Sequence, residues 1–210
     1  MAIRTGAGMS LRPYINGFDY QKMLNHFGSG GQAAKESAIA ITDKLFKGDD
    51  PEFVESRRSC AAIITRAFDR GVPFPGLDGE DDNYVCSAVA LAEAGQTFFR
   101  PDPNDDSWKI TLMEDLLARH ERRFDARTYK LLSFIRDGRP LFGKRIITGW
   151  SYYAYLTSAE VQELAAGVRQ SQQAYPELAS PGCFDGFLLT LLGWLDRIAE
   201  SKLDLWLFAA

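Results

Sequence analysis

Hydrophobic residues recur at three- and four-residue spacing along most of the chain, which predicts amphipathic helices with one buried stripe each. The last predicted helix is apolar nearly all round, because Leu189 and Trp194 lie outside its main stripe, and this is typical of a central helix. We expect helices over residues 19–27, 32–47, 51–70, 83–99, 107–122, 126–135, 158–174 and 183–200.

The clearest helix start is the sequence Thr157-Ser-Ala-Glu160. A hydroxyl at the first position accepts a hydrogen bond from the Glu160 backbone N–H, and the Glu160 side chain accepts one from the backbone N–H of Thr157. Leu156 and Val161 stand where a hydrophobic staple would place them. The pattern therefore predicts a helix that begins at residue 158.

Extended segments are few and short. Aromatic residues favour a strand over 152–156, and Pro13 restricts the segment 12–18 to an edge strand. Because isolated strands are not stable, these segments indicate one small sheet. The expected strands lie at 12–18, 145–148, 152–156 and 203–208.

These elements predict an α+β fold that is mostly α. We expect a single multi-helix domain over residues 1–210, with a small sheet formed by short strands near both termini and around 145–156. Residues 1–10 carry no such pattern and are expected to be flexible.

Composition agrees with a soluble globular protein. Hydrophobic residues make up 46% and charged residues 25% of the chain, so a core can form without a metal or disulfide, and the net charge of −4 gives no general attraction to nucleic acid. Cys60, Cys86 and Cys183 are expected to be buried reduced thiols, which fits a cytoplasmic protein. The apolar stretch 184–195 is too short to span a membrane.

Phosphate-loop and calcium-loop patterns are both incomplete. After Gly28, a phosphate loop needs Gly-Lys where the chain has Ala33-Ala34, so we interpret this segment as a helix–helix turn. The acidic spacing from Asp102 to Asp106 lacks the glycine and the chelating glutamate that calcium requires. No cofactor is expected from these segments.

Catalytic and metal-ligating patterns are also missing. Only two histidines occur, His26 and His120, and neither has metal-ligand spacing. A nucleophilic Cys183 would need a base that only a distant histidine could supply, and Tyr153 breaks the nucleophile-elbow pattern. The sequence predicts no catalytic residue and no metal site.

One segment is strongly charged. Residues 119–145 contain nine basic residues against three acidic ones, and arginine suits bidentate recognition of carboxylate or phosphate. An aromatic run follows at once. Either these arginines form ion pairs with the acidic remainder of the chain, which we favour, or they form a surface for an acidic protein, a phosphate ligand or RNA. The candidate surface comprises Arg119, Arg122, Arg123, Arg127, Arg139, Lys144, Arg145, Trp150, Tyr152 and Tyr153.

Three segments together resemble a bacterial family of uncharacterised proteins, a domain of unknown function. They are Leu11-Arg-Pro-Tyr-Ile15 leading to Gly28-Ser-Gly30, then Gly149-Trp-Ser-Tyr-Tyr-Ala-Tyr-Leu-Thr157, then Leu192-Gly-Trp-Leu195 leading to Asp204-Leu-Trp-Leu-Phe208. The likeness covers both ends and most of the final third of the chain. It implies a bacterial origin and a single domain, and it carries no activity or site residue.

Three function classes stay open. The leading hypothesis is a non-enzymatic binding protein with an unidentified protein partner, such as an immunity-type protein that occludes a toxin. The second is an enzyme or small-molecule binder, with a site assembled from Arg119, Arg123, Tyr152, Tyr153 and Asp185. The third is nucleic-acid binding through residues 119–145, which the negative net charge disfavours.

Overall fold

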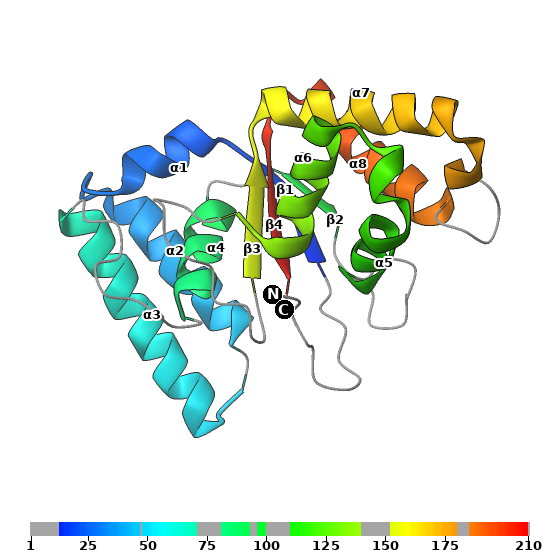
Figure 1. Cartoon of the computed structure of the whole chain (residues 1–210). Helices are drawn as coiled ribbons and strands as arrows, with labels where there is room; N and C mark the ends of the chain where they lie inside the picture. The colour runs from blue at the N-terminus through cyan, green and yellow to red at the C-terminus, as the bar shows by residue number, and fades with distance from the viewer. Residues whose placement is uncertain are drawn as a thin grey trace.

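The computed structural model describes residues 13–46, 48–70, 81–92, 96–99, 110–139, 152–179 and 185–209. The four strands of this part are β1 (Pro13–Phe18), β2 (Gln96–Phe99), β3 (Tyr152–Leu156) and β4 (Asp204–Ala209). They form one antiparallel sheet in the order β2-β1-β4-β3 (Figure 1). The final strand therefore lies between the first and third strands.

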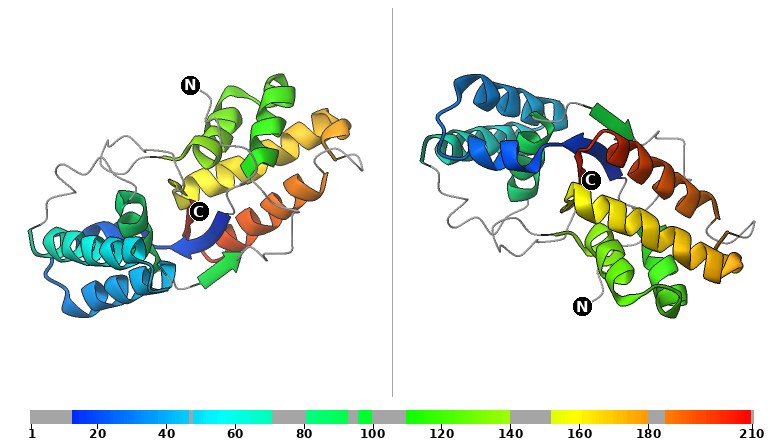
Figure 2. Two further views of the ribbon diagram at one scale, coloured as in Figure 1. Left: turned by 90° about the horizontal axis from the view of Figure 1, so that it is seen from below. Right: turned by 90° about the horizontal axis from the view of Figure 1, so that it is seen from above.

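Helices lie on both faces of this sheet (Figures 1 and 2). On one face lie α1 (Tyr20–His26), α2 (Gln32–Leu45), α3 (Pro51–Arg70) and α4 (Asp81–Ala92). On the other lie α5 (Ile110–His120), α6 (Ala126–Asp137), α7 (Ser158–Ala174), α8 (Asp185–Glu200) and the 3-10 turns η1 (Glu121–Arg123) and η3 (Pro176–Ala179). The α+β fold class, mostly α with a small sheet, is confirmed.

The sheet separates two hydrophobic cores, because alternate residues of a strand point to opposite faces. In β4, Leu205 and Leu207 belong to the core with α5–α8, whereas Trp206 and Phe208 belong to the core with α1–α4. Both sets are almost fully buried. Burial on both faces of the sheet explains why the strand sequences are nearly continuous runs of hydrophobic residues.

The face toward α1–α4 is aromatic. The Trp206 ring stacks on Tyr153 with 4.9 Å between ring centroids, and meets the Phe18 ring edge-on at 5.4 Å. Cys60 and Cys86 are buried in the same core, as the sequence predicted. Cys183 lies outside the described residues.

One predicted helix is wrong at its end. The pattern placed residues 83–99 in a single helix, but α4 ends at Ala92 and residues 96–99 form β2. Ile15 pairs with Phe99 and Asn16 with Thr97, with a register shift between the two pairs. Backbone pairing with β1 thus outweighs the helical spacing of Gln96 and Phe99, since a β-branched residue and two aromatic residues suit a strand. The strand expected at 145–148 lies outside the described residues.

Candidate functional site

The basic segment begins where α5 ends. Met113, Leu116 and Leu117 bury one side of α5, which leaves Asp115 and Arg119 on its exposed side. At His120 the backbone leaves the α-helical region, with φ −124° and ψ 20°, and η1 follows as a tight turn.

Two anchors hold this turn at the surface. Phe124 is 7% exposed and belongs to the core beneath α5 and α6. The Asp125 carboxylate then accepts hydrogen bonds from the backbone N–H groups of Arg127 (2.8 Å) and Thr128 (3.0 Å) and begins α6. Because the buried positions lie on both sides of η1, its charged side chains face outward.

A surface depression of about 520 Å³ lies at this corner. Its walls are residues 118–123 and Tyr175, the residue that follows α7. We call it the α5–η1 depression. It brings Arg119, Arg122 and Arg123 together with His120, so three of the ten predicted surface residues share one concave site.

Two of its arginines have acidic partners within the chain. The Arg119 guanidinium lies 3.7 Å from an Asp115 carboxylate oxygen one helical turn earlier. That of Arg123 lies 3.2 Å from a Glu177 oxygen on η3, and its Cζ lies 4.5 Å from the centre of the Tyr175 ring. In the part of the chain that the structure describes, no ion pair of Arg122 is found.

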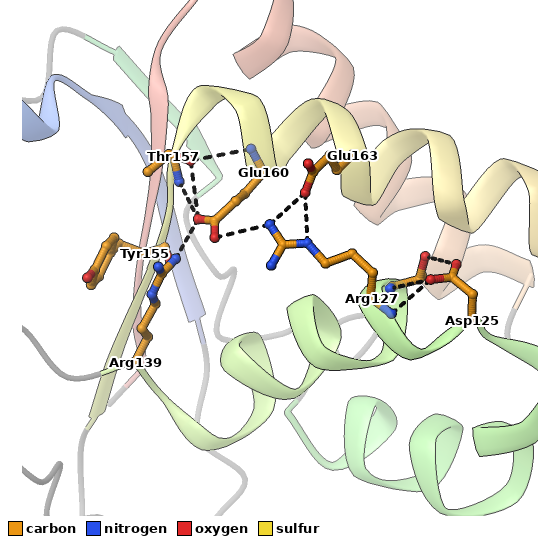
Figure 3. A network of polar contacts seen from close by, with 8 residues as sticks. Asp125, Arg127, Arg139, Tyr155, Thr157, Glu160 and Glu163 are labelled. Carbon is orange, nitrogen blue, oxygen red and sulfur yellow. Dashed lines mark hydrogen bonds and ion pairs between the residues drawn. The ribbon is translucent and has the colours of Figure 1, made fainter.

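The next arginines form a different arrangement, an ion-pair network between α6 and α7 (Figure 3). From α6, Arg127 reaches α7 and contacts Glu163 at 2.6 Å and Glu160 at 3.5 Å. On the other side of Glu160, the Arg139 guanidinium donates a hydrogen bond to its carboxylate. The Glu160 side chain is thus shared by two arginines and the cap of its own helix.

The predicted capping box is confirmed at this point. The Thr157 side chain accepts a hydrogen bond from the Glu160 backbone N–H at 3.3 Å, and the Glu160 carboxylate accepts one from the Thr157 N–H at 3.0 Å. Burial acts to raise the pKa of Glu160, but the hydrogen bonds from Arg139 and Thr157 outweigh it and hold the pKa below its ordinary value. Glu160 is therefore an ionised, 9% exposed carboxylate.

Arg139 also protects an edge of the sheet. Its backbone N–H donates to the Tyr153 carbonyl at 3.1 Å, and its guanidinium donates to the Tyr155 carbonyl at 3.4 Å. The Cζ atom lies 4.4 Å from the Tyr155 ring centre and 4.7 Å from that of Phe134. These contacts occupy the outer edge of β3, where unpaired carbonyl groups would otherwise meet solvent.

The remaining predicted residues do not join the depression. Tyr153 is 4% exposed and stacked on Trp206, so its ring belongs to the core and not to a binding surface. The backbone of Tyr152 lies in β3, paired with Ala209. Lys144, Arg145 and Trp150 lie outside the described residues.

The predicted ion pairs with the acidic remainder of the chain are thus found for four arginines of the basic segment, Arg119, Arg123, Arg127 and Arg139. Arg136 instead pairs at 2.6 Å with Asp137, which belongs to the segment itself. The proposed enzyme set is not assembled as one site, because Arg119 and Arg123 line the depression while Tyr153 faces the core with α1–α4.

Sequence reasoning missed Tyr175, Glu177 and Asp115 as parts of the site. Asp115 carried a detectable signal, since it stands four residues before Arg119 on a helix. The other two come from the end of α7 and from η3, and no local pattern links them to η1.

The described residues contain no group of three or more His, Cys, Asp or Glu side chains placed to hold a metal ion. None of the described helices combines the length and the hydropathy that crossing a membrane requires. No family model matches this chain, and no curated protein and no solved structure matches it either.

Proposed function

We propose that this chain is a non-enzymatic binding protein that holds an acidic protein partner at the α5–η1 depression. One observation carries the proposal: Arg119, Arg122 and Arg123 lie around one concave surface of about 520 Å³ on a helical corner. Arginine is enriched at protein interfaces because its planar guanidinium forms bidentate contacts with carboxylates.

The rest of the basic segment supports the choice of this site. Arg127 and Arg139 share the nearly buried Glu160 carboxylate, so they stabilise the contact between α6, α7 and β3. Arg122 is exposed and lines the depression, where a partner can reach it.

A concrete form of this function is an immunity-type protein that occludes a toxin in the bacterial cytoplasm. That form rests on analogy and on the resemblance to the bacterial family of unknown function. A partner whose active surface is acidic would complement the three arginines of the depression, of which Arg122 has no ion pair among the described residues, although Glu121 also lines it.

A pull-down of the tagged chain from a lysate of its own cells tests the proposal. The Arg119→Glu/Arg122→Glu variant reverses charge at the depression, and Arg66→Glu/Arg70→Glu reverses the same charge on exposed positions of α3, across the sheet. We expect one stoichiometric protein, lost with the first variant, kept with the second and indifferent to nuclease.

Two results would overturn the proposal. Equal recovery of the partner with both folded variants would show that binding does not use the depression. Recovery that disappears on nuclease treatment would replace the protein partner with nucleic acid, and steep salt dependence would accompany it.

A further inference from the structure

We infer that Asp115 and Glu177 occupy the positions that carboxylates of a bound partner take, so that the α5–η1 depression receives an acidic peptide segment by exchange of ion pairs. The inference deepens the proposed function and rests on it. The ligand is a segment with at least two carboxylate side chains. Asp115 and Glu177 compete with those side chains for the guanidinium groups of Arg119 and Arg123.

Both internal ion pairs are exposed enough to exchange. The side chains of Arg119 and Asp115 are 68% and 58% exposed, and those of Arg123 and Glu177 are 44% and 46% exposed. Exposed pairs of this kind contribute little to stability, because water solvates both charges well and each long side chain loses freedom on pairing. A partner carboxylate can therefore replace either acid at small cost to the fold.

Arg123 is held in place by a contact that does not involve Glu177. Its Cζ lies over the Tyr175 ring, 4.5 Å from the ring centre, a position in which the ring attracts the cation. A stacked guanidinium still presents N–H groups at its edge, in the fork that matches a carboxylate. When Glu177 moves away, Arg123 stays in position for an incoming acid.

Arg122 supplies the attraction that the exchange needs. In an exchange, the number of ion pairs at Arg119 and Arg123 is unchanged, so binding requires a further contact. Among the described residues Arg122 has no ion pair, and it lines the same depression. A carboxylate bound there adds a pair without breaking one.

The size of the depression fits a peptide segment better than a single carboxylate. Its volume of about 520 Å³ is much larger than one carboxylate group, and the depression is open to solvent. The two internal pairs favour the same ligand class, since a carboxylate is the group that each guanidinium already contacts.

Fluorescence anisotropy with labelled hexaglutamate as the probe tests the inference at low ionic strength, where exposed charges are least screened. The Asp115→Asn/Glu177→Gln variant removes both competitors. The control, Glu36→Gln/Glu55→Gln, makes the same change in net charge on exposed positions of α2 and α3.

We expect the affinity for hexaglutamate to rise about three- to fivefold for each competitor removed, and to stay within about twofold of wild type in the control. Arg119→Gln/Arg122→Gln is expected to lower the affinity at least about tenfold. Circular dichroism and thermal unfolding of every variant confirm that the fold is kept.

The two proposals fail in different ways. If Arg119→Gln/Arg122→Gln abolishes binding while Asp115→Asn/Glu177→Gln equals its control, the exchange is wrong and the proposed function stands. If wild-type protein and the arginine variants bind hexaglutamate equally, both are wrong. The third outcome is that inorganic pyrophosphate displaces the labelled peptide at a lower concentration than unlabelled hexaglutamate does, and that removing Asp115 and Glu177 raises the affinity for pyrophosphate more than the affinity for the peptide. In that case the depression is a phosphate site, and the carboxylate assignment is overturned.

Discussion

The carboxylate of Asp204, at the start of β4, accepts a hydrogen bond from the backbone N–H of Ser158, the first residue of α7, at 2.6 Å. Its other oxygen accepts one from the N–H of Tyr20, the first residue of α1, at 2.8 Å. The two helices lie on opposite faces of the sheet. One side chain thus caps both helices and ties both layers to the central strand.

Removing this carboxylate is expected to destabilise the whole fold. Asp204→Ala leaves the backbone N–H groups of Tyr20 and Ser158 without their acceptor, while the caps at Asp19 and Thr157 remain. Each lost hydrogen bond costs about 1 kcal/mol, so we expect a loss of about 2 kcal/mol in the free energy of unfolding. Asp204→Asn keeps one acceptor oxygen and should lose about half as much. Urea unfolding measures both, and Asp43→Ala on the exposed side of α2 is the control. A loss no larger than that of the control would contradict the double cap.

Replacing Arg139 should have a larger effect than its partial exposure suggests. Arg139→Ala removes the ion pair with Glu160, the contacts with the Phe134 and Tyr155 rings, and the guanidinium bond to the edge of β3. We expect a loss of about 2–3 kcal/mol, because a nearly buried carboxylate loses one of its two arginines. Chemical denaturation checks this value.

A double-mutant cycle with Glu160→Gln separates the ion pair from the ring contacts. The coupling energy gives the contribution of the pair, and the loss that remains for Arg139→Ala in the Glu160→Gln background gives that of the rings and the strand edge. Arg139→Lys keeps the charge but loses the planar stacking, so an intermediate loss is expected. Full retention of stability in Arg139→Ala would show that these contacts are dispensable.

Acid should weaken the link between α6 and α7. The pKa of Glu160 lies below its ordinary value of 4.5 in the folded state, so the stability it provides is present above about pH 4.5 and is lost as the pH falls through the lower folded-state pKa. Hydrogen bonds from the Thr128 side chain, and from the backbone N–H groups of Thr128 and Arg127, likewise lower the pKa of Asp125. Protonation of either carboxylate at low pH therefore lowers the stability of the fold.

Unfolding of Glu160→Gln as a function of pH measures this effect. The variant should be less stable than wild type at pH 7, and the difference should shrink as the pH falls through the lowered pKa of Glu160, where the wild-type carboxylate becomes protonated. A difference that stays constant over this range would mean that the charge of Glu160 does not contribute.

Replacing two glycines inside helices with alanine should change the stability of the protein in opposite directions. A Cβ atom on Gly167 of α7 would lie 1.9 Å from the Thr128 Oγ1 atom on α6, so Gly167→Ala should cost about 2–3 kcal/mol through overpacking. A Cβ atom on Gly193 of α8 meets no atom within 4 Å. Gly193→Ala should therefore stabilise the protein by up to about 1 kcal/mol, the usual gain from replacing a helical glycine.

Thermal unfolding of both variants is a direct comparison, since the chemical change is identical. Thr128→Ala removes the nearest atom, so the cost of Gly167→Ala should be smaller in that background. Equal shifts of the midpoint for Gly167→Ala and Gly193→Ala would contradict the close approach of α6 and α7.

Local sequence signals predicted much of the fold. The capping box at Thr157 and Glu160 placed the start of α7 correctly, because both hydrogen bonds involve residues three positions apart. Alternation of apolar residues cannot mark a strand that is buried on both faces, yet the aromatic residues of 152–156 and the apolar run of 203–208 still indicated β3 and β4. These predictions depend only on neighbours along the chain.

Elements and contacts that depend on residues far away in the sequence were predicted less well. The segment 96–99 was assigned to a helix, because its strand state depends on pairing with β1, about 80 positions earlier. The basic segment gave the right residue types, but its sequence could not show that Arg139 would lie between two rings or that Arg123 would meet Tyr175 and Glu177. Those partners are brought together only by the packing of α5, α6 and α7.

The place of β4 at the centre of the sheet has a consequence for biosynthesis. Translation proceeds from the N-terminus, so β1 emerges early and must wait for the strand that pairs with it along its whole length. The Asp204–Tyr20 hydrogen bond joins residues 184 positions apart. Until β4 is made, the nascent chain exposes the apolar faces that Trp206 and Leu207 will cover, and such surfaces are the ones that chaperones bind. Synthesis of β4, and not the emergence of the helices, is therefore the step that completes both cores.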